Sequence, residues 1–189
     1  MKKINETVNI YVFDVDDTLI DTKACVCAVD AAGNIVFRAG TQTFNAPDST
    51  SKLLTPGLRW DFSEFESLEQ IMSEPKRAPF EKLKELAADR KKVYICTCRQ
   101  KRHMLWKWLA LNGIRIPIDH IMCYDASEGM SPADWKAYHI TKVAHDIANA
   151  NYWSINVLVH LYEDDRNFKD AIFEDLSLAQ INYIDEPID

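Results

Sequence analysis

The sequence predicts a three-layer, Rossmann-like α/β fold, in which helices cover both faces of a parallel sheet. Five short apolar segments have the length and the β-branched and aromatic composition of buried strands. They cover residues 8–13, 93–96, 118–123, 155–162 and 181–184. Helical patterns separate most of these segments, and strands that alternate with helices are typical of a parallel sheet.

The N-terminal part contains an insertion between the first two of these strands. Residues 23–29 and 35–44 are expected to form a hairpin around DAAGN, because Gly and Asn favour tight turns. Residues 46–57 have the composition of a loop, and residues 61–72 that of a short helical piece ended by Pro75. We expect one domain over residues 1–189, with residues 23–72 as a small hairpin-and-helix insertion, that is, a minimal hairpin cap.

The remaining segments complete the alternation. Pro79 begins a helix over 79–92 whose apolar residues recur at helical spacing. The next helix ends at Asn112-Gly113. Residues 132–149 are expected to be helical with a break near His139, and a last helix over 167–176 leads into the final strand.

Composition narrows the function classes. Of the 189 residues, 47% are hydrophobic and 27% charged, which is the balance of a globular protein with one ordinary core. The net charge of −7 argues against a broad nucleic-acid-binding face, although a small basic pocket remains compatible with it. No apolar run approaches the roughly 20 residues of a membrane span, and the N-terminus does not resemble a signal peptide. The five cysteines lack zinc-site spacing, so we expect reduced thiols in a cytoplasmic protein. The oligomeric state stays open.

Three of the expected strands end in polar residues. They are followed by Asp14-Val15-Asp16-Asp17-Thr18, by Thr97-Cys98-Arg99 and by Glu163-Asp164-Asp165-Arg166. If the strands are neighbours, these residues meet at one edge, where open parallel sheets bind ligands. Crowded carboxylates require a counter-charge, and Mg²⁺ prefers oxygen ligands. A metal beside a free carboxylate suits phosphoryl transfer: one carboxylate attacks phosphorus, and a second moves protons.

The order and spacing of these motifs over residues 8–185 resemble the haloacid dehalogenase (HAD) superfamily of phosphatases. The Asp-x-Asp-x-Thr motif of that family is matched by Asp14, Asp16 and Thr18, the strand ending in Thr by VYICT with Thr97, and the strand ending in paired acids by LYEDD with Asp164 and Asp165. A lysine on the preceding helix has two candidates, Lys136 and Lys142. We favour Lys142, because it opens the final helical stretch before the strand.

The resemblance implies a role for each matched residue. Asp14 would be the nucleophile that becomes an aspartyl phosphate, and Asp16 the general acid and base. Thr97 and Lys142 would hold the phosphate. Mg²⁺ would be bound by Asp14, the main-chain carbonyl of Asp16, Asp164 and Asp165. Thr18 would hold the loop, and Asp17 would be solvated or supporting.

Two details bear on the substrate. Thr-x-Arg and Asp-Asp-Arg resemble the phosphatase part of polynucleotide kinase 3′-phosphatases and small stand-alone bacterial and phage relatives, which implies that Arg99 contacts phosphate. A small cap leaves room for a bulky nucleotide or nucleic-acid 3′-phosphate. The alternatives are a phosphatase of small metabolites or nucleoside monophosphates, and a non-catalytic binding protein of the same fold. The intact pair of Asp14 and Asp16 argues against the last.

Overall fold

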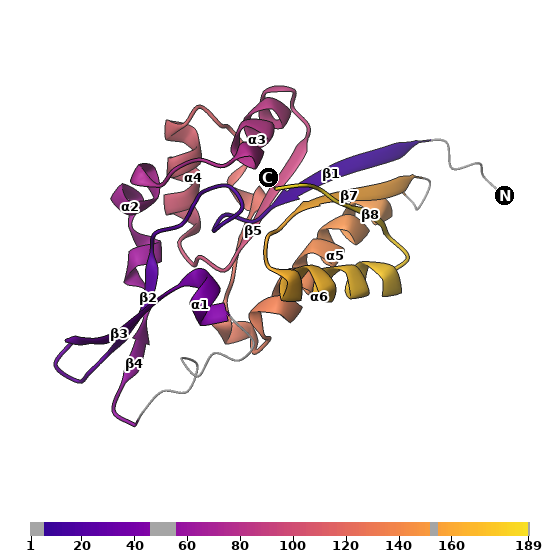
Figure 1. Ribbon diagram of the computed structural model, residues 1–189. Helices are drawn as coiled ribbons and strands as arrows, with labels where there is room; N and C mark the ends of the chain where they lie inside the picture. The colour runs from indigo at the N-terminus through magenta and orange to yellow at the C-terminus, as the bar shows by residue number, and fades with distance from the viewer. Residues whose placement is uncertain (1–5, 46–55, 152–154, 189) are drawn as a thin grey trace.

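A five-stranded parallel sheet forms the centre of the protein (Figure 1). The computed structural model describes residues 6–45, 56–151 and 155–188. The sheet has the order β6-β5-β1-β7-β8. Its strands are β1 (Thr7–Phe13), β5 (Lys92–Thr97), β6 (Ile121–Cys123), β7 (Asn156–Tyr162) and β8 (Asn182–Asp185). The α/β class and the parallel sheet are therefore confirmed.

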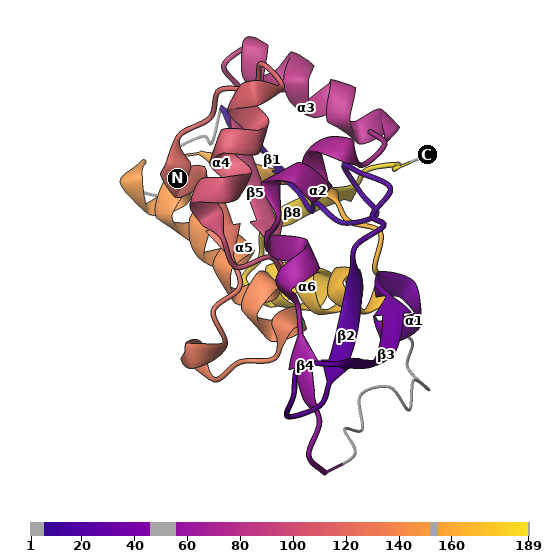
Figure 2. The same ribbon diagram turned by 90° about the vertical axis from the view of Figure 1, so that its left-hand side faces the viewer.

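Helices cover both faces of the sheet (Figures 1 and 2). On one face lie α2 (Leu68–Ser73), α3 (Ala78–Ala88) and α4 (Arg102–Leu111), and on the other α5 (Pro132–Ala150) and α6 (Arg166–Leu178). Phe13 and Ile95 pack in the hydrophobic cluster on the side of α2, α3 and α4, whereas Ile10 and Val12 pack in the cluster on the side of α5 and α6. Successive strand residues point to opposite faces, so a continuously apolar strand supplies both cores.

Two expected elements differ in extent. Helix α5 runs for 19 residues without interruption, so the expected break near His139 is wrong. Ser131 caps its start by accepting a hydrogen bond from the Asp134 amide, and a buried face that includes Ile140 and Ala144 holds it against the sheet. The expected strand 118–123 begins with a 3₁₀ turn, η3 (Ile118–His120), so only its last part joins the sheet.

The insertion is a small antiparallel sheet of its own, with the order β3-β2-β4. The expected hairpin is present as β2 (Cys25–Val29) and β3 (Ile35–Gly40), but the residues after it form a short helix, α1 (Thr41–Asn45). The sequence analysis missed β4 (Arg59–Asp61), which pairs with β2, and the 3₁₀ turn η2 (Ser63–Glu66) follows it. The expected loop over 46–57 lies largely outside the described residues.

We call residues 25–66 the cap. Val26 and Phe65 of the cap form a small hydrophobic core together with Ala24, the residue just before it, and Phe44 and Trp60 pack against them. Helix α2, which we expected to belong to the insertion, contributes Ile71 to the main core instead. Figure 1 shows the cap at the end of the sheet toward which β1 runs.

Two broader expectations can be compared with the structure. All five cysteines are free thiols. No helix in the described part of the chain has the length and apolar character needed to cross a membrane.

Candidate active site

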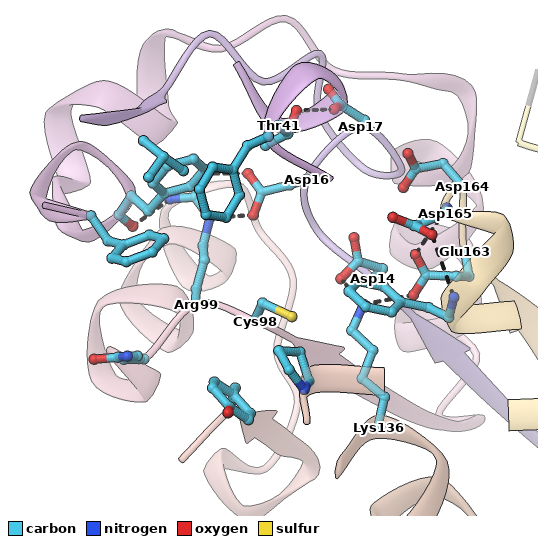
Figure 3. A pocket seen from close by; sticks show the side chains of 18 of the residues that line it. Asp14, Asp16, Asp17, Thr41, Cys98, Arg99, Lys136, Glu163, Asp164 and Asp165 are labelled. Carbon is cyan, nitrogen blue, oxygen red and sulfur yellow. Dashed lines mark hydrogen bonds and ion pairs between the residues drawn. The ribbon is translucent and has the colours of Figure 1, made fainter. Parts of the chain in front are cut away.

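A cavity of about 630 Å³ lies between the cap and the ends of the central strands. Strand β1 is flanked by β5 and β7, so the three polar strand ends are neighbours. Figure 3 shows their side chains gathered around the cavity, with Lys136 reaching in from α5. Parallel pairing thus brings together residues that are up to 150 positions apart in the chain.

A buried lysine holds the first two carboxylates. The ammonium of Lys136 lies 2.8 Å from Asp14 Oδ1 and 2.6 Å from Glu163 Oε2, and its side chain is only 1% exposed. Burial by itself lowers the pKa of Lys136, but the negative charges of Asp14 and Glu163 outweigh it and hold that pKa well above its usual value. Lys136 is therefore a fixed positive charge beside Asp14.

Lys142 is not part of this site. Its side chain is 52% exposed and pairs with Asp146 at 2.6 Å, on the outside of α5. Lys136 and Lys142 are six residues apart, and at about 3.6 residues per turn they point to different sides of one continuous helix. The choice of Lys142 over Lys136 as the lysine at the site is therefore wrong.

Three carboxylates converge beside Lys136. Asp14, Glu163 and Asp164 each offer an oxygen, and these oxygens all lie within 4.8 Å of one another. The Thr18 hydroxyl donates a 3.0 Å hydrogen bond to Asp164, so it ties the loop after β1 to the end of β7. Burial raises the pKa values of Asp14 and Asp164, and the positive charge of Lys136 opposes this rise.

This cluster is short of positive charge. One ammonium faces three carboxylates, and burying unpaired carboxylates is costly. The donors are all carboxylate oxygens, which suit a hard divalent cation such as Mg²⁺. The residues at this position therefore fit the expected cofactor.

Glu163 is a residue that the sequence analysis did not assign to the metal. Phe13 and Tyr162 are register partners, and the Asp14 amide donates a 2.9 Å hydrogen bond to the Tyr162 carbonyl. Asp14 and Glu163 are consequently the first residues after two adjacent strands. This shared position, directly after an apolar strand, is the feature of the sequence that could have indicated Glu163 as a site residue.

The Asp165 side chain is used at the start of α6. Its carboxylate caps α6 by accepting hydrogen bonds from the amides of Asn167, at 2.8 Å, and Phe168, at 3.4 Å. It lines the cavity but does not belong to the three-carboxylate cluster. The expectation that Asp165 assists the metal stays a prediction.

Asp16 is held by Arg99 from the end of β5. The guanidinium donates from Nε and Nη2 to the two carboxylate oxygens at 3.0 and 2.7 Å, and from Nη1 to the Phe65 carbonyl at 2.6 Å. The Thr22 hydroxyl adds a 2.7 Å hydrogen bond to Asp16. Arg99 is only 2% exposed. Because it bonds both Asp16 and the Phe65 carbonyl, it joins the end of the strand to the cap. The side chain of Asp16 does not belong to the three-carboxylate cluster, and the expectation that its carbonyl binds metal stays a prediction.

Thr97 and Asp17 are both buried beside the site. Thr97 does not line the cavity, and its hydroxyl accepts a 3.2 Å hydrogen bond from the Arg99 amide. The expectation that Thr97 holds the phosphate stays a prediction. Asp17 was expected to be solvated or supporting; it is buried, which fits the supporting place, and it has a positive φ of 58°. Its carboxylate accepts hydrogen bonds from the Thr22 amide and the Thr41 hydroxyl, and Asp17 thereby ties the loop to α1 of the cap.

Comparison of the chain with protein-family models, with curated proteins and with solved structures finds no match. The residues of the cavity are therefore what indicates a function. They offer a buried carboxylate beside a fixed ammonium, a second carboxylate on the same loop, and a carboxylate cluster that fits a divalent cation.

Proposed function

We propose that this protein is a Mg²⁺-dependent phosphomonoester hydrolase of the HAD type, which works through an aspartyl phosphate on Asp14. One observation carries the proposal: Asp14 is paired with Lys136 and clustered with Glu163 and Asp164 in a cavity that Asp16 also lines. This combination meets the needs of phosphoryl transfer, which are a nucleophile, neutralising charge and a proton carrier.

The reaction would run in two displacements. An oxygen of Asp14 forms a bond to phosphorus while the ester bond to the leaving oxygen breaks, and Asp16 gives that oxygen its proton. A water molecule then attacks the phosphorus of the aspartyl phosphate. Its proton returns to Asp16, inorganic phosphate leaves, and the Asp14 carboxylate is restored.

Positive charge has to balance the incoming phosphate. Lys136 supplies one charge directly beside Asp14. Asp14, Glu163 and Asp164 are the residues that would hold Mg²⁺, whose contribution when bound is to neutralise the phosphate oxygens.

Arg99 would change its hydrogen-bond partner when the substrate binds. Its guanidinium contacts both oxygens of Asp16, which must be free to transfer a proton. When a phosphate enters, we expect Arg99 to exchange part of this contact for a phosphate oxygen, since guanidinium groups pair well with either anion. Substrate arrival would then release Asp16.

The test is phosphate release in Mg²⁺ from an aryl phosphate, nucleoside 5′- and 3′-monophosphates and an oligonucleotide with a 3′-phosphate. Asp14→Asn should abolish release, and excess EDTA should do the same for the wild type. Asp21→Asn is the matched control, because Asp21 is in the same loop but pairs with Lys23 at the surface and does not line the cavity. Equal release by wild type and Asp14→Asn would refute the mechanism. Ligand binding with no release from any compound would favour the non-catalytic alternative.

A further inference from the structure

The cavity has an aromatic part as well as an acidic one. Its apolar lining residues are Val26, Phe44, Phe62 and Phe65 from the cap, and Tyr124, Ala126, Pro132 and Phe168 from the core. Phe62 is 42% exposed, which is unusual for so large an apolar side chain at the border of a cavity. Phe44 supports it edge-on, with ring centroids 6.0 Å apart, and also packs edge-on against Trp60 at 5.2 Å. A supported, exposed ring is suited to contact another flat ring.

The apolar part of the lining disfavours a sugar ring placed against it, although Thr41, Gln100 and Asn167 also line the cavity. The hydroxyl groups of a free sugar lose hydrogen bonds with water when they are buried against apolar walls, and each unpaired group is costly. An aromatic leaving group has the opposite balance, because its burial removes apolar surface from water. The aromatic part of the cavity therefore favours a substrate with a ring.

The charged side chains of the cavity limit the number of phosphate groups that it can bind. Among the described residues that line the cavity, seven are acidic and two are basic. Both basic side chains, Arg99 and Lys136, are already paired with carboxylates. One phosphate can be balanced by Lys136 and a divalent cation, but the further phosphates of a polynucleotide would meet uncompensated negative charge.

These observations deepen the proposed function, on which this inference rests. We infer that the substrate is a nucleoside monophosphate, with its single phosphate at Asp14 and its base against Phe62 and Phe44. The cavity volume of about 630 Å³ lies in the range of sites that enclose one small organic molecule. The inference selects mononucleotides over both sugar phosphates and nucleic-acid ends.

The experiment compares thymidine 5′-monophosphate with 2-deoxyribose 5-phosphate, which presents the same phosphoester bond without the base. We measure kcat/KM for phosphate release in Mg²⁺ and, in parallel, calorimetric binding to the wild type. The base should improve both quantities by about tenfold, the scale of one base stacked on an aromatic side chain. Phosphotyrosine, which has a ring but no nucleoside, should fall below thymidine 5′-monophosphate.

Two variants locate the effect. Phe62→Ala should remove most of the preference for the nucleotide, so that its kcat/KM falls toward that of 2-deoxyribose 5-phosphate measured with the same variant. Phe37→Ala is the matched control, because Phe37 is 40% exposed on β3 of the same cap but does not line the cavity. It should leave both substrates unaffected. Both rings are partly exposed, so we expect both variants to fold, and thermal unfolding of each variant checks this.

The outcomes separate this inference from the proposed function. Release from both compounds at equal efficiency, or an unchanged preference in Phe62→Ala, overturns the inference while the phosphatase survives. Higher efficiency with a 3′-phosphorylated oligonucleotide than with thymidine 3′-monophosphate also overturns it. Binding that prefers the nucleotide and is lost in Phe62→Ala, without any phosphate release, supports the inference and refutes the hydrolase.

Discussion

Replacing Lys136 by methionine tests the charge balance of the site most directly. Methionine keeps much of the side-chain volume but removes the ammonium that contacts Asp14 and Glu163. All three side chains are nearly inaccessible, at 1%, 7% and 2% exposure, so water cannot replace the lost partner. Removing one partner of a buried ion pair typically costs about 3–5 kcal/mol of stability. For a chain of this size the loss corresponds to a Tm lower by about 10 °C.

The assay is urea unfolding of wild type and variant in EDTA, at one pH, followed by circular dichroism. Lys142→Met is the control: it removes an exposed pair on the same helix and should cost no more than about 0.5 kcal/mol. Similar losses in the two variants would refute the reasoning. If Lys136→Met does not fold, the double variant with Glu163→Gln decides the matter, because removing one carboxylate together with the ammonium should restore part of the stability.

Further predictions concern the metal, the cap and a thiol in the cavity. Saturating Mg²⁺, at about 100 times its Kd, should stabilise the wild type by about 2.7 kcal/mol; Glu163→Gln should lose most of that increment and Asp165→Asn should retain it, and equal retention would contradict the cluster. Thr41→Val should cost about 1–3 kcal/mol in urea unfolding, because it removes a partner of the buried Asp17 carboxylate; a neutral effect would contradict that contact. Burial raises the pKa of the Cys98 thiol to about 12, so below that pH the reactive thiolate is scarce. Alkylation of Cys98 by iodoacetamide, followed by mass spectrometry, should therefore be slow at pH 8 and rise about tenfold per pH unit, and a plateau near pH 9 would contradict this.

The strand ends could be predicted from the sequence because strand composition and parallel pairing are local and regular. Asp14, Asp16 and Arg99 could be predicted because each comes just after the end of an apolar run, and all three line one cavity. Lys136 could not be chosen on the same basis. Which side of α5 faces the site depends on the helix being continuous from Pro132 to Ala150. The expected break near His139 made Lys142 look like the first lysine of the helix before the strand.

Other misses have equally specific causes. Strand β4 has three residues, which is too short to give an alternating pattern. Glu163 was overlooked because the family pattern directed attention to Asp164 and Asp165, although strand register marks it as the counterpart of Asp14. Thr97 was placed by motif; its hydroxyl accepts a hydrogen bond from the Arg99 amide, and its contact with phosphate stays a prediction. Strand β4 and the place of Glu163 both depend on pairing between strands, which no single segment contains.

The links between cap and loop have a consequence for protein engineering. Arg99 donates to the Phe65 carbonyl, and Asp17 accepts from Thr41, so two buried charged groups in or beside the loop after β1 find partners in the insertion. Deleting residues 25–66 to widen substrate range would leave both without those partners, and the loop bearing Asp14 and Asp16 would lose its supports. The cap is thus not a detachable module. Changes of specificity should be sought by substitution within it, at Phe62 first, rather than by exchanging or removing it.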